Sequence, residues 1–103
     1  MFERDRQQDA RIVRRVLSGQ SPAFEALVER YMPAVRAAAM ARLGNDADAD
    51  DVVQEAFLKA YQALDSLRDP GKFGAWLLSI ARNACNRLDR RRQRETPLAD
   101  APT

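Results

Sequence analysis

The sequence predicts an all-α protein, a compact bundle of three to four helices. Apolar residues recur every three or four positions along almost the whole chain, and no segment alternates as a strand would. The gaps between these periodic segments carry helix-ending signals, which are Gly19, Gly44-Asn45 and the turn 68-RDPGK-72. With 103 residues, 46% of them hydrophobic, the chain is the size of one domain and too apolar for disorder.

The first two helices follow from their end signals. The first should run from about Asp9 to Ser18 and end at Gly19. Ser21-Pro22 supplies a cap and a first-turn proline for the second, which should continue to about Leu43 with a kink at Pro33. Their apolar stripes are Ile12, Val13, Val16 and Leu17, and then Phe24, Leu27, Val28, Tyr31, Val35, Ala38 and Ala39.

The third helix should begin near Asp46 or Asp48, because acidic side chains favour the positive end of the helix dipole. The fourth should run from about Phe73 to Arg94. We therefore expect residues 1–95 to form one helical domain and 96–103, with two prolines and no periodicity, to begin an interdomain linker. The expected core stripes are Val53, Phe57, Ala60, Tyr61 and Leu64, and then Phe73, Leu77, Ala81, Ala84 and Leu88.

The residues that usually carry catalysis and metal binding are scarce. The chain has no histidine and one cysteine, which excludes a cysteine zinc site and the commonest general base. Cys85, in mid-helix, is expected to pack as a small hydrophobe, and the acidic cluster lacks the glycine-turn spacing of an EF-hand. We expect a protein that is not an enzyme and needs no metal or cofactor. No apolar run reaches the ~20 residues of a membrane span, so we expect no membrane insertion and a cytoplasmic location.

Charge is distributed unevenly along the chain. The segment from Asp46 to Glu55 has five acidic residues and no basic one, whereas the segment from Arg82 to Glu95 has six arginines and two acidic residues. This asymmetry indicates two partners, one at each pole, and the arginine pole suits an anion such as nucleic acid.

Both later helices have a second face besides the core stripe. On the fourth, a line passes from an aromatic residue through an amide to arginines, a pattern that suits nucleic acid but also fits a half-buried aromatic followed by a solvated helix end. On the third, a polar face with an exposed leucine is either solvated surface or a docking site for a protein. Periodicity leaves both interpretations open. The two lines are Trp76, Ile80, Asn83, Arg87, Arg90 and Arg94, and Asp51, Gln54, Glu55, Leu58 and Gln62.

The string 50-DDVVQEAFLKAYQALDSLRDPGKFGAWLLSIARNACNRLDRRRQR-94 resembles region 2 of bacterial sigma factors of the sigma-70 family, most closely the extracytoplasmic-function (ECF) group. The acidic helix, the loop, the F-x-x-W-L-x-x-I-A-x-N motif and the arginine-rich helix occur in order. The resemblance covers roughly Phe24 to Arg94 and is specific because the motifs are long and correctly spaced.

The resemblance implies a promoter-recognition subunit that binds core RNA polymerase, at the clamp coiled coil of its largest subunit, and recognises and melts the −10 element by holding the non-template strand. It also implies control by an anti-sigma factor. The polymerase-binding residues that it implies are Asp50, Asp51, Gln54, Glu55 and Leu58. The DNA-binding residues that it implies are Leu67, Lys72, Phe73, Trp76, Arg82, Asn83, Arg87, Arg90 and Arg91.

The chain departs from the family pattern in two ways. Only Phe73 and Trp76 supply aromatics near the melting helix, so we expect weak autonomous melting and a stringent promoter requirement. No helix-turn-helix that would read the −35 element follows, so we expect the first domain of a longer protein, which alone binds DNA poorly. Two other hypotheses are a helical module that binds only proteins and an enzyme that depends on Cys85; insensitivity to loss of Arg87 and Arg90, or an activity abolished by Cys85→Ala, would favour them respectively.

Overall fold

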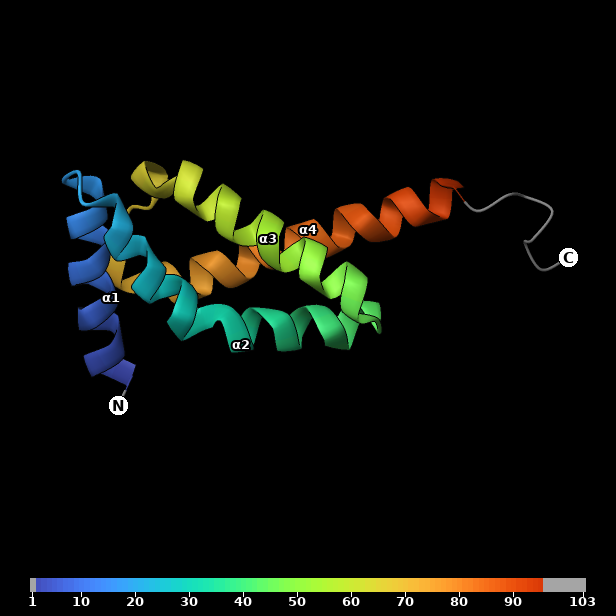
Figure 1. The fold of residues 1–103 in the computed structure, drawn as a ribbon, viewed down its shortest axis with the longest axis horizontal. Coiled ribbons are helices and arrows are strands. Elements are labelled where there is room, and N and C mark those ends of the chain that lie inside the picture. The colour runs from blue at the N-terminus through green and yellow to red at the C-terminus, as the bar shows by residue number, and fades with distance from the viewer. Residues whose placement is uncertain (1, 96–103) are drawn as a thin grey trace, which may run out of the picture.

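The computed structural model describes residues 2–95, with side chains from Arg4 onward. Within this range every regular element is helical, which confirms the all-α prediction. Helices α2, α3 and α4 pack along one another, and α1 crosses them at one end (Figure 1). The expected linker at 96–103 lies outside the described residues. The elements are α1 Phe2–Leu17, η1 Ser21–Ala23, α2 Phe24–Leu43, α3 Asp46–Gln62, η2 Leu64–Ser66, η3 Pro70–Lys72 and α4 Phe73–Glu95, where η denotes a single 3-10 turn.

Two helix starts differ from the expectation. Helix α1 begins at Phe2, well before Asp9, because its polar first turns pack against η3, where Arg6 Nε donates to the Gly71 carbonyl at 3.3 Å. Polar turns of this kind leave no trace in an apolar pattern. The Ser21–Ala23 segment forms a separate 3-10 turn, so α2 begins only at Phe24.

Helix α2 has the expected bend, and the chain breaks as expected between α2 and α3. Pro33 lies within α2, and Figure 1 shows this helix changing direction along its length. At the end of α2, Gly44 adopts a φ of 77°, which favours glycine, and its N–H donates to the Met40 carbonyl at 2.9 Å. Asn45 then caps α3, because its side chain accepts the Asp48 N–H at 2.9 Å.

The core lies where the four helices meet. Its largest fully buried side chains include Leu27, Leu64, Phe73 and Leu77. Three residues expected in the core are instead exposed, and four are half-buried. The Tyr61 ring meets Phe24 in an edge-to-face contact, Leu17 is the last residue of its helix, and Ala38 lines an open groove between α2 and α4. The exposed residues are Leu17, Ala38 and Tyr61, and the half-buried ones are Ile12, Val28, Tyr31 and Leu88.

A buried carboxylate ties α1 to α2. Asp9 is 1% exposed and accepts hydrogen bonds from Arg30 Nη1, at 2.7 Å, and from the Tyr31 hydroxyl. Burial, followed by the bond to Asp9, raises the pKa of Tyr31. The Tyr31 ring also packs on Phe73, with 5.6 Å between ring centroids, and lies against the backbone of Gly74. This cluster holds the crossing helix in place.

Candidate functional site

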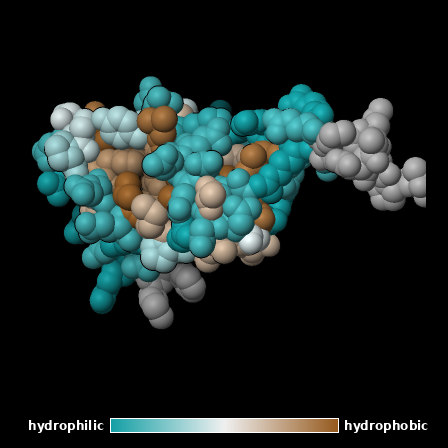
Figure 2. All heavy atoms as spheres, turned by 45° about the vertical axis from the view of Figure 1, so that its right-hand side comes forward, coloured by the Kyte–Doolittle hydropathy of each residue, from teal (hydrophilic) through white to brown (hydrophobic). Residues whose placement is uncertain are grey.

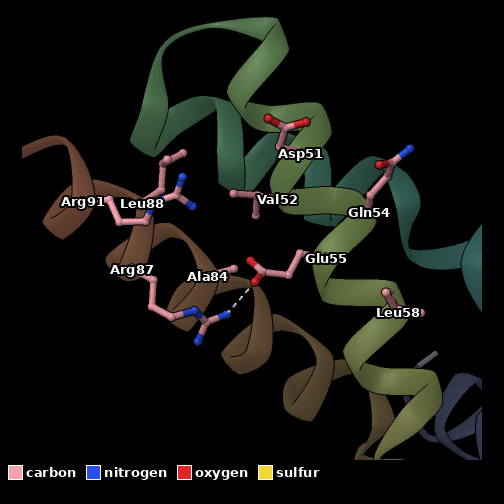
Figure 3. Close-up of a pocket in the computed structure, with 9 residues that line it drawn as sticks. All are labelled: Asp51, Val52, Gln54, Glu55, Leu58, Ala84, Arg87, Leu88 and Arg91. Carbon is pink, nitrogen blue, oxygen red and sulfur yellow. Dashed lines mark ion pairs between the residues drawn. The ribbon is translucent and has the colours of Figure 1, made fainter. Parts of the chain in front are cut away.

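The outward face of α3 presents an apolar residue among polar ones. Leu58 is 58% exposed, and Asp51 and Gln54 lie on the same side of the helix (Figure 3). These residues line one wall of a cavity of about 500 Å³, and Ala84, Arg87, Leu88 and Arg91 of α4 line the opposite wall. The face is therefore an open groove between the two helices.

Glu55 leans from this face across the groove toward α4 (Figure 3). Its Oε1 atom lies 3.2 Å from Arg87 Nη2 and 3.5 Å from Lys59 Nζ. The Arg87 Nη2 atom is buried but makes no hydrogen bond of acceptable geometry with a described residue, so the attraction to Glu55 is one of charge. Two residues expected at different sites, Glu55 and Arg87, are thus paired with each other.

Most of the acidic cluster is neutralised within the fold. Asp46 and Asp50 both pair with Arg36 of α2, and Asp48 pairs with Arg92 of α4. Asp50 is therefore directed at α2 and does not line the groove with Leu58. Asp51 makes no ion pair with any residue in the described range, and no three potential ligand side chains of that range lie close enough to hold a metal.

A second cavity, of about 380 Å³, lies farther along the same helix pair. Four members of the second stripe of α4 line it together: Trp76, Ile80, Asn83 and Arg87. Trp76 and Ile80 are half-buried, so each serves both the core and the cavity. The opposite wall comes from the end of α3 and the turn after it, with Lys59, Gln62, Ala63 and Ser66.

Sequence reasoning did not assign Lys59, Gln62 or Ser66 to this site. The spacing of Lys59 and Gln62 places them one helical turn apart on the same side of α3, but nothing in the sequence shows that this side faces Asn83. That information lies in the packing of α3 against α4.

The remaining residues expected to bind DNA lie in the core, on the turns before α4, and along α4 itself. Phe73 is 0% exposed, and its ring packs in the core against Phe24, Tyr31 and Trp76. Leu67 is half-buried and Lys72 is exposed on the adjoining turns.

The arginines of α4 point to different sides. Arg82 lines a groove between α2 and α4, away from Asn83 and the second cavity. Arg90 and Arg91 are exposed on the end of α4, which projects past α2 and α3 (Figure 1) and is largely hydrophilic (Figure 2). Neither of these two makes an ion pair with a residue in the described part of the chain.

The sigma-70 region 2 family matches residues 27–95, which is more than half of the chain, and the protein belongs to this family. The relatives that it resembles are ECF sigma factors. It is 42% identical over 92 residues to the ECF RNA polymerase sigma-E factor of Escherichia coli (strain K12), 41% to that of Salmonella typhimurium (strain LT2) and 38% to that of Haemophilus influenzae. Each match covers 89% of this chain and 48% of the relative, so the chain spans about half the length of the curated relatives it matches. These matches confirm the resemblance to ECF sigma factors.

No helix in the described part of the chain combines the length and the apolar character needed to span a bilayer.

Proposed function

We propose that this chain is the promoter-recognition domain of an ECF sigma factor, which docks on core RNA polymerase through α3 and holds the −10 element through α4. The observation that carries the proposal is Leu58, which is 58% exposed on a helix of the sigma-70 region 2 family, beside Asp51, which has no ion pair within the described part of the chain. An exposed apolar side chain ringed by polar groups is the usual form of an interface anchor. Polymerase performs the reaction, and this chain contributes recognition.

Binding to purified bacterial core RNA polymerase tests the docking face. Burying a leucine side chain contributes about 1.5–3 kcal/mol, so Leu58→Ala should weaken binding roughly 10- to 100-fold. Asp51→Arg should also weaken it, because the carboxylate is expected to meet basic groups of the polymerase. Leu17→Ala is the matched control, since Leu17 is 48% exposed on α1 and outside this face. Equal losses from the two leucine variants would rule out a dock at Leu58.

We propose that the second cavity receives one unstacked base of the −10 non-template strand. Trp76 offers an apolar wall, Asn83 and Gln62 offer donors and acceptors for a base edge, and Lys59 and Arg87 offer positive charge. Unstacking a base costs a few kcal/mol, which stacking and phosphate contacts offset. Arg90 and Arg91, beyond the cavity, would hold the backbone.

Single-stranded oligonucleotides from a random pool, scored by fluorescence anisotropy and sequencing, separate these roles. Asn83→Ala should change which sequences are selected, whereas the double variant Arg90→Ala/Arg91→Ala should weaken all sequences and reduce the salt dependence. Arg14→Ala/Arg15→Ala on α1 removes the same charge from exposed positions elsewhere. If that control variant lost as much binding, the effect would come from net charge and not from α4.

Three further parts of the proposal concern the whole protein. We propose that a longer chain carries a −35-reading domain, that it acts in the cytoplasm, and that an anti-sigma protein covers the Leu58 face. If so, excess core polymerase should displace such a regulator, and Leu58→Ala should weaken both complexes. A regulator whose binding is unaffected by Leu58→Ala would use another surface.

A further inference from the structure

Arg87 stands at the boundary between the two cavities. It lines the groove below Leu58 and also the cavity that contains Trp76 and Asn83. Its guanidinium is held by Glu55, because Arg87 Nη2 lies 3.2 Å from Glu55 Oε1 (Figure 3). One side chain is therefore shared between the proposed polymerase face and the proposed DNA cavity.

The second partner of Glu55 leads to the same cavity. Lys59, whose Nζ is 3.5 Å from the carboxylate, lines the wall opposite Arg87. Lys59 and Arg87 are the two cationic residues among those that line this cavity, and Glu55 pairs with both. One carboxylate, which is not among the residues that line the cavity, therefore offsets part of the positive charge of both cations.

The ion pair between Glu55 and Arg87 can be exchanged for a contact between Arg87 and another anion. The Nη2 atom is buried yet has no hydrogen-bond partner among the described residues, so the pairing leaves a donor unused. The Arg87 side chain is 39% exposed, so its guanidinium can turn into the cavity, where a phosphate oxygen would accept from that donor and carry its own charge. Glu55 itself is 41% exposed in its side chain, so it can turn toward solvent or toward a partner on the α3 face.

We propose that Glu55 is an internal competitor of DNA: it occupies Arg87 and Lys59 in the free protein and lowers the affinity of the cavity for a nucleotide phosphate. This inference rests on the proposed DNA-binding function. Because Glu55 also faces the groove below Leu58, a basic group of a protein docked there would draw the carboxylate away and release both cations. Docking on α3 and DNA binding on α4 would then favour each other.

Glu55→Gln tests the competition in the 103-residue chain, with a fluorescent single-stranded oligonucleotide as the probe. Releasing a half-exposed ion pair corresponds to about 0.2–1 kcal/mol per pair, so two pairs should give roughly 2- to 30-fold tighter binding. Asp51→Asn is the matched control: it removes the same charge from the same helix, one turn away, but from a carboxylate without an ion pair in the described range. It should change affinity by less than about 2-fold, the effect of net charge alone.

The gain must also depend on the released cations. In an Arg87→Ala/Lys59→Ala background, Glu55→Gln should give no more than Asp51→Asn does. Equal gains from Glu55→Gln and Asp51→Asn, or a gain that survives loss of both cations, would overturn the competition while leaving DNA binding intact. Absence of binding by every variant, each shown to be folded by circular dichroism, would instead reject the DNA-binding function and this inference with it.

Discussion

Replacing Gly74 by alanine should destabilise the protein, although alanine is the better helix former. A Cβ atom at Gly74 would lie 2.7 Å from the Tyr31 hydroxyl oxygen, and 2.8 and 2.9 Å from two ring carbons. Tyr31 cannot simply turn aside, because its hydroxyl is bonded to the buried Asp9 and its ring packs on Phe73. The added methyl group must therefore displace an anchored side chain.

The opposing contributions can be compared. Helix propensity favours alanine by about 0.8–1 kcal/mol. Overpacking costs about 1–3 kcal/mol, and loss of a hydrogen bond to the buried charge of Asp9 costs a further ~1.5–3 kcal/mol. The net expectation for Gly74→Ala is a loss of about 1.5–5 kcal/mol from the free energy of unfolding, a large share of the ~5–15 kcal/mol that a domain possesses.

Urea denaturation followed by circular dichroism at 222 nm measures this loss. The sharper test is a double-mutant cycle with Tyr31→Ala, which removes the obstacle. In that background Gly74→Ala should be neutral or stabilising by up to about 1 kcal/mol, as propensity alone dictates. If Gly74→Ala stabilised the otherwise unchanged protein, the reasoning about the clamped tyrosine would be refuted.

Other perturbations of the buried groups have defined outcomes. Asp9→Asn should lower the free energy of unfolding by about 1–3 kcal/mol, measured in urea, because Arg30 and Tyr31 lose a charged partner. Burial raises the pKa of the Cys85 thiol, so a thiol reagent should label it slowly at pH 8 until urea unfolds the chain. The Tyr31 and Cys85 pKa values are both raised on folding, so the folded state holds these protons more tightly and stability should fall as pH rises above about 9 to 10. Tyr31→Phe should reduce that alkaline loss in a urea-midpoint series from pH 8 to about 11.

Local sequence signals predicted helix ends well where a single residue type is favoured by the backbone conformation of that position. Gly44 ends α2 in the left-handed region, and Asn45 caps α3, as the break between them indicates. Periodicity did not predict that Asp9 is buried, because its partners, Arg30 and Tyr31, are more than twenty positions away in sequence. A polar residue on a helix becomes a core residue only through such tertiary contacts.

In the candidate site, too, spacing within one helix was predictable and contacts between helices were not. The spacing on α4 placed Trp76, Asn83 and Arg87 on one line, and these three residues do share a cavity. The identity of the opposite wall, and the pairing of Glu55 with Arg87, depend on how α3 is rotated and displaced against α4. Helical spacing describes one helix at a time, so it could not supply either.

The helical order of the last turns of α4 should depend on the ions around them. Beyond Asp89 its side chains are all exposed, and the ion pair of Arg92 with Asp48 ties this stretch to α3. Arg87 and Arg91, and likewise Arg90 and Arg94, stand four residues apart, where like charges oppose the helix by about 0.2–0.5 kcal/mol per pair. Screening or a bound polyanion relieves this repulsion. Amide hydrogens of the last two turns should accordingly exchange fast in low salt and more slowly when polyphosphate is added. A bound anion would thus stabilise the helical conformation of this end.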